Sequence, residues 1–99
     1  MENLKVIENE LVPVYVTSTG EKVVYGSELH EVLSVKSPYR EWSQRRLKDC
    51  DALEKEDFQA VEISTPSGQT KKDHIIKLDT AKEMAMLERI ELVKAMIKK

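Results

Sequence analysis

The sequence predicts one small α+β domain, and three observations support this fold class. The chain has 99 residues and a mass of 11.4 kDa, which is enough for a single hydrophobic core. Two pairs of β-branched segments each flank a short turn that contains glycine, as in β-hairpins. Helix start signals and helical spacing of apolar residues follow each pair. We expect a β-hairpin, two short helices in a helix-turn-helix-like arrangement, a second, wing-like hairpin and a long C-terminal helix.

The first hairpin is predicted after a lead-in. Residues 1–10 hold few apolar side chains, and they are expected to be flexible or to form a short strand. Leu11 to Thr17 is rich in β-branched residues, and Pro13 predicts a strand at a sheet edge because proline has no N–H to donate. A turn at Gly20, where glycine tolerates a positive φ, leads into the partner strand, Glu21 to Tyr25.

Two short helices are predicted next. Ser27 is suited to cap a helix from Glu28 to Leu33, because its hydroxyl can accept a hydrogen bond from a free backbone N–H. Ser37 is a second natural N-cap, and Pro38 occupies the favoured first helical position. The second helix is expected to run to about residue 49.

The second hairpin and the last helix complete the fold. Phe58 to Ser64 and Thr70 to Lys77 flank a turn that contains both proline and glycine, which predicts a pair of strands. Thr80 opens a Thr-Ala-Lys-Glu capping box, with Asp79 as an alternative cap. The helix that follows is expected to reach the C-terminus.

Composition narrows the functional classes. The 16 basic residues nearly balance the 18 acidic ones, so the net charge of −2 does not indicate a nucleic-acid or membrane partner. The single cysteine, Cys50, excludes an intrachain disulfide and is typical of a reducing compartment. No apolar run approaches the roughly 20 residues that cross a bilayer. We therefore expect a protein that stays inside the cell, with no membrane partner.

The small net charge is the sum of two opposed segments. Residues 36–48 hold five basic residues against one acidic residue, and residues 49–57 hold five acidic residues against one basic residue. Arg46 falls within the apolar arc of the second predicted helix, where we expect its stem to pack and its charged head to reach solvent. Four acidic residues form a candidate surface for a basic protein target: Asp51, Glu54, Glu56 and Asp57.

The outward face of the second predicted helix is basic. Lysine and arginine can neutralise phosphates, while arginine and glutamine forks can match guanine and adenine edges. Lysines on the second hairpin could contact the phosphate backbone of DNA, with the hairpin acting as a wing. They could also simply discourage edge-strand aggregation. The same residues also fit an ordinary solvated face. The candidate surface for double-stranded DNA consists of Arg40, Gln44, Arg45, Lys48, Lys71 and Lys72.

The last helix carries two apolar stripes instead of one. Ala81, Met84 and Ala85 begin one stripe, which is suited to pack on the domain. The second stripe has the four-three-four spacing of a heptad seam, so it predicts a homodimer through Met86, Ile90, Val93 and Ile97. The alternative is that a small domain covers both faces of this helix.

Residue constellations for catalysis are missing from the sequence. His30, His74 and Cys50 are isolated, with no metal-ligand spacing, no glycine-rich phosphate loop and no nucleophile elbow. Cys50 lies between two aspartates, which do not favour a thiolate. We expect no catalytic residues, no metal and no cofactor.

Three blocks of sequence resemble a known family. One runs from Tyr25 to Arg46 and contains Tyr-Gly-Ser-Glu-Leu-His and Trp-Ser-Gln-Arg-Arg. The second comprises Glu56-Asp-Phe and His74-Ile-Ile, and the third is Leu-Asp-Thr-Ala-Lys-Glu-Met-Ala-Met-Leu-Glu-Arg, residues 78–89. In this order the blocks resemble the N-terminal domain of the AntA/AntB antirepressor family of phages and prophages, which is similar in arrangement to KilA-N and Bro-N domains.

The resemblance implies a function without catalysis. Residues 11–89 would form the family's domain, and residues 90–99 would extend the last helix where relatives break it and continue into a further domain. Family membership implies a regulator that relieves repression of phage genes by engaging a repressor or another regulatory protein. Two alternatives remain open: a winged helix-turn-helix-like module that binds DNA, and a small inhibitor that presents its acidic patch.

Overall fold

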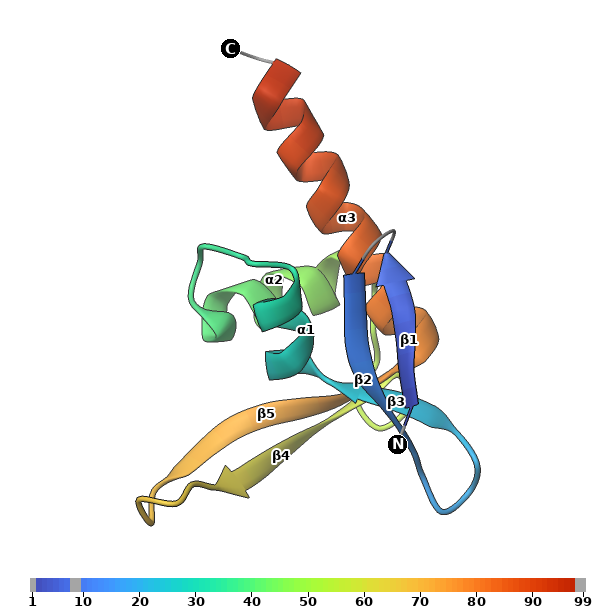
Figure 1. Ribbon diagram of the computed structural model, residues 1–99, viewed down its shortest axis with the longest axis vertical. Helices are drawn as coiled ribbons and strands as arrows, with labels where there is room; N and C mark the ends of the chain where they lie inside the picture. The colour runs from blue at the N-terminus through green and yellow to red at the C-terminus, as the bar shows by residue number, and fades with distance from the viewer. Residues whose placement is uncertain (1, 8–9, 98–99) are drawn as a thin grey trace.

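The computed structural model describes residues 2–7 and 10–97, with side chains described from residue 12 to residue 91. The described residues form an α+β fold, which confirms the expected class (Figure 1). The elements, in chain order, are β1 (Glu2–Ile7), β2 (Glu10–Val16), β3 (Lys22–Tyr25), α1 (Gly26–Val32), α2 (Tyr39–Asp49), β4 (Phe58–Ser64), β5 (Thr70–Lys77) and α3 (Leu78–Ile97).

The strands form one antiparallel sheet in the order β1-β2-β3-β5-β4. The two expected hairpins are present, and β3 joins them by pairing with β5, so that Val24 lies opposite Ile76. The residues that could have been a flexible lead-in include β1, which pairs with β2. In Figure 1 the β4–β5 hairpin projects from the rest of the molecule, beside the helices α1 and α2.

The prediction that Pro13 marks an edge strand was wrong. Strand β2 lies between β1 and β3. The register with β3 contains only two pairs, Tyr15 with Val23 and Val16 with Lys22. Pro13 lies outside that ladder, so its missing N–H removes no hydrogen bond from the pairing with β3.

The helices begin at other residues than the sequence predicts. Helix α1 begins at Gly26 without a side-chain cap, and the Ser27 hydroxyl bonds instead to Asp73 on β5. Helix α2 begins at Tyr39, with Pro38 rather than Ser37 at the N-cap position. Helix α3 begins at residue 78, directly after β5, so the predicted capping box lies inside the helix.

The core lies between the sheet and the three helices. Trp42 and Leu29 are its largest fully buried apolar side chains, and Val24 and Ile76 contribute from the central strands. The first stripe of α3 faces this core, since Ala81, Met84 and Ala85 are fully buried. Among the described helices, none is long and apolar enough to span a membrane.

Candidate binding cleft between helix α2 and the β4–β5 hairpin

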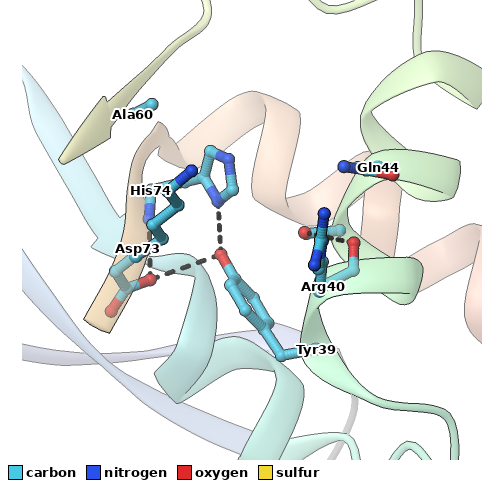
Figure 2. A pocket seen from close by; sticks show the side chains of 8 residues that line it. Tyr39, Arg40, Gln44, Ala60, Asp73 and His74 are labelled. Atoms are coloured by element: carbon cyan, nitrogen blue, oxygen red, sulfur yellow. Dashed lines mark hydrogen bonds between the residues drawn. The ribbon is translucent and has the colours of Figure 1, made fainter. Parts of the chain in front are cut away.

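A cleft of about 560 Å³ separates helix α2 from the β4–β5 hairpin. Helix α2 supplies one wall, and strands β4 and β5 supply the other (Figure 2). Residues at i and i+4 share a face of a helix, and alternate residues share a face of a strand, so each wall presents a regular set of side chains. The lining residues are Tyr39, Arg40, Ser43, Gln44, Ala60, Lys72, Asp73 and His74.

The carboxylate of Asp73 ties β5 to the start of α1. It is only 1% exposed, and it accepts hydrogen bonds from the Ser27 backbone N–H at 3.0 Å and the Ser27 hydroxyl at 2.5 Å. The backbone N–H of His74 and the hydroxyl of Tyr39 also donate to it, at 2.7 and 3.3 Å. A carboxylate is stabilised near a helix N-terminus by the helix dipole and free N–H groups. Asp73 is therefore a structural anchor whose oxygens are already occupied.

Tyr39 links the anchor to His74. Its hydroxyl lies 2.7 Å from His74 Nδ1, and both contacts are drawn in Figure 2. A hydroxyl has one proton, so when Tyr39 donates to Asp73 it accepts the Nδ1–H of His74. Burial raises the pKa of Tyr39 strongly, and the charge of Asp73 raises it further, so the phenol stays protonated. Burial lowers the pKa of His74, although Asp73 and Glu54 oppose the shift.

Gly26 allows this close packing. A Cβ atom at this position would lie 2.1 Å from the Tyr39 hydroxyl oxygen and 3.2 Å from Cδ1 of Ile76. No side chain fits there without displacing the tyrosine. The network beside the cleft thus requires glycine at this position.

The accessible charge of the cleft is positive. Arg40 on α2 and Lys72 on β5 are exposed and lie on opposite walls. Within the described residues, neither side chain makes a hydrogen bond or an ion pair. Gln44, also exposed and without a described partner, reaches from α2 toward the hairpin in Figure 2. The arrangement can receive an anionic group between two cations.

The structure divides the six residues proposed for DNA contact. Arg40, Gln44 and Lys72 line the cleft together. Arg45 lines a separate groove of about 310 Å³, which the α1–α2 loop and α3 form. The two remaining lysines, Lys48 and Lys71, are exposed and do not line either hollow.

The expectation that the head of Arg46 reaches solvent was wrong. Arg46 is 4% exposed, and its guanidinium bonds to Glu88 on α3 at 2.9 and 3.2 Å. It also pairs with Glu91 and with Asp49. Burial would lower the pKa of Arg46, but the hydrogen bonds to Glu88 and Glu91 outweigh it and raise the pKa above its ordinary value. The side chain connects α2 to α3 and does not belong to the cleft.

The acidic patch lies on the loop between α2 and β4. Asp51, Glu54 and Glu56 are exposed, while Asp57 is half-buried and accepts the backbone N–H of Leu53 at 2.9 Å. Its role as a protein-binding surface stays a prediction. The dimer stripe is only partly described: Met86 is 59% and Ile90 is 48% exposed, and the side chains of Val93 and Ile97 lie outside the described residues.

Cys50 and His30 are held by packing and hydrogen bonds within the fold. Cys50 packs against the core, and burial, followed by the charge of Glu83, raises the pKa of its thiol to about 11. His30 donates its Nε2–H to the Ser37 carbonyl oxygen at 2.7 Å, and its ring lies beside those of Tyr39 and Trp42. Among the described residues, no group of three or more metal-ligating side chains could hold a metal ion.

The sequence did not single out Tyr39, Asp73 or His74 as members of the cleft. In the sequence His74 is isolated, because its partner Tyr39 lies on a distant segment of the chain. The available signal is strand alternation, which places Lys72 and His74 on one face of β5. Only the position of α2 over that face shows what they meet.

The comparisons with known proteins give one match. Residues 24–90 match the family model described as AntA/AntB antirepressor. Neither a curated protein nor a solved structure matches the chain. The matched range contains both walls of the cleft and the helices that position them.

Proposed function

The chain belongs to the AntA/AntB antirepressor family, so its role is regulatory, and from this premise we propose that it relieves repression by binding a repressor protein of a phage or prophage. The observation that carries the proposal is the family match, which spans residues 24–90 and includes every helix of the domain up to residue 90. The action needs no chemical step, because a bound repressor can be withdrawn from its operator by mass action alone. Because repressors act on DNA, the site of action in this proposal is the cytoplasm of the bacterial host cell.

Displacement of the cognate repressor from its operator tests this proposal. The repressor is first bound to labelled operator DNA, and the chain is then added at increasing concentration. We expect DNA to be released and a complex of the two proteins to co-purify. Retention of operator occupancy at saturating chain, with no complex, would contradict the proposal.

A second candidate function is direct binding to double-stranded DNA. The observation in its favour is that Arg40 and Gln44 on α2 and Lys72 on β5 meet at one cleft between a helix and a wing-like hairpin. Phosphate contacts release counterions, so the affinity for DNA should fall steeply as salt rises. A triple variant in which alanine replaces Arg40, Arg45 and Lys48 should lose this binding to DNA. A triple variant that binds duplex DNA as tightly as the parent chain rules this candidate out.

A further inference from the structure

We propose that the cleft between α2 and the β4–β5 hairpin binds an acidic segment of the protein partner, with a carboxylate held between Arg40 and Lys72. The inference rests on the proposed function, because it identifies which surface of the chain an antirepressor would use and which chemistry its partner must carry. Three features of the cleft support it: its charge, its shape and its hydrogen-bonding groups.

The charge of the cleft is unbalanced. Arg40 and Lys72 are exposed on opposite walls without a described ion-pair partner. The one carboxylate in the lining, that of Asp73, is 1% exposed and already accepts four hydrogen bonds. Three acidic residues on the same elements, Glu41 and Asp49 on α2 and Glu62 on β4, do not line the cleft, although Glu62 lies opposite Lys72 in the β4–β5 register. A carboxylate entering between the two cations would thus be attracted by Arg40 and Lys72, while Glu62, beside Lys72, lies outside the lining.

The shape favours a protein segment over a DNA duplex. A recognition helix must protrude if its side chains are to enter the major groove. Arg40 and Gln44 instead line a hollow that faces the hairpin, with the small residue Ala60 on the opposite wall (Figure 2). A volume of about 560 Å³ accommodates a few side chains of a peptide. A straight duplex would contact a hollow mainly at its rim, so the shape favours the protein segment.

Hydrogen-bonding groups in the cleft suit an extended backbone. The amide of Gln44 offers both donors and an acceptor, and it has no described partner. Ser43, in the same wall, is only 1% exposed, and it donates its hydroxyl to the Arg40 carbonyl oxygen at 3.2 Å. A peptide bound here can exchange backbone hydrogen bonds with Gln44 while its carboxylate pairs with the cations.

A peptide titration tests the assignment. The ¹⁵N-labelled full chain is titrated with an acetylated glutamate decamer, with a glutamine decamer of the same length and with a short DNA duplex, and amide shifts are followed by NMR. The glutamate decamer should shift the amides of residues 40, 44, 72 and 74, and the glutamine decamer should not. The double substitution Arg40→Gln and Lys72→Gln should weaken the affinity for glutamate roughly tenfold or more.

The control removes the same charge outside the cleft. Arg45→Gln combined with Lys71→Gln should change the affinity for the glutamate decamer by less than about twofold, because neither residue lines the cleft. Both double variants must keep the far-ultraviolet circular dichroism of the parent. Four results would overturn the proposal: no binding of the glutamate decamer, equal losses in the two variants, shifts confined to other residues, or cleft-dependent binding of the duplex alone.

Failure of this inference is distinct from failure of the proposed function. If the cleft variant still removes the repressor from its operator as well as the parent chain, the cleft is not the partner site but the antirepressor role stands. If the glutamate decamer binds the cleft and the parent chain never binds the repressor, the acidic-segment chemistry is correct and the proposed function is wrong.

Discussion

The tight packing around Gly26 predicts that a single added Cβ atom destabilises the fold. In the Gly26→Ala variant the new Cβ would meet the Tyr39 hydroxyl oxygen at 2.1 Å. We expect a loss of about 1–3 kcal/mol in the free energy of unfolding, typical of overpacking, together with broken hydrogen bonds to Asp73 and His74. Chemical denaturation measures the loss. The Tyr39→Phe background is the control: it removes the clashing oxygen, so the alanine should cost less there.

The lowered pKa of His74 predicts how the stability of the fold depends on pH. Burial lowers its pKa from the ordinary 6.5, so the folded chain disfavours the charged imidazolium. The unfolded chain then binds more protons just below pH 6.5, and stability should fall as the pH drops through this range and be restored above it. Thermal unfolding at pH 7.5 and pH 5.5 measures the difference. His74→Gln should lose much of this acid sensitivity; an unchanged pH dependence in that variant would contradict the assignment.

Helices α2 and α3 are joined by a buried ionic cluster, which makes an element-scale prediction. Glu88 Oε1 accepts hydrogen bonds from Trp42 Nε1 at 2.9 Å and from the guanidinium of Arg46. Arg46 is 4% and Glu88 is 8% exposed. Without Glu88, Arg46 keeps only its exposed partners, Glu91 and Asp49, and Trp42 Nε1 loses its acceptor, so Glu88→Ala should cost about 3 kcal/mol in the free energy of unfolding. Urea titrations followed by circular dichroism measure this cost.

The control for that cluster is Asp49→Ala. Asp49 also pairs with Arg46, at 3.1 Å, but its side chain is 43% exposed. An exposed pair contributes less than about 1 kcal/mol, so this variant should remain close to the parent. Because Trp42 is the only tryptophan, its fluorescence reports on the same contact and should shift in the Glu88 variant alone. Equal costs for the two variants would show that the cluster is not the link between the helices.

The elements that the sequence predicts best are those with a local cause. Both hairpins follow from alternation and turn residues, and Gly20 and Gly68 have the positive φ that their turns require. The errors are nonlocal. Serine is a residue type that often caps helices, but the Ser27 hydroxyl donates a hydrogen bond to Asp73, which is distant in sequence. Arg46 was expected to reach solvent because helix periodicity does not show that Glu88 would be opposite it.

The candidate cleft was predictable only in part for the same reason. The basic face of α2 follows from helical periodicity, which correctly placed Arg40 and Gln44 outward. The opposite wall depends on the pairing of β3 with β5, which brings the second hairpin beside the helices. That pairing joins segments about fifty residues apart, and no turn signal specifies it. Helical periodicity therefore predicts the basic face of α2, and the tertiary structure shows that part of this face lines a cleft.

At the scale of the whole molecule, α3 extends away from the sheet and the other helices (Figure 1). Met86 and Ile90, the described members of the second apolar stripe, are exposed. The four-three-four spacing is that of a seam between two helices, so we expect two copies of the chain to pair along α3. Sedimentation should show a dimer at about 50 µM, in an equilibrium that depends on concentration. Ile90→Lys should give a monomer, because pairing would bury its charge, whereas Lys82→Ala on an exposed position of the same helix should remain dimeric. A parent chain that sediments as a monomer at that concentration would refute the pairing and leave the stripe as exposed surface.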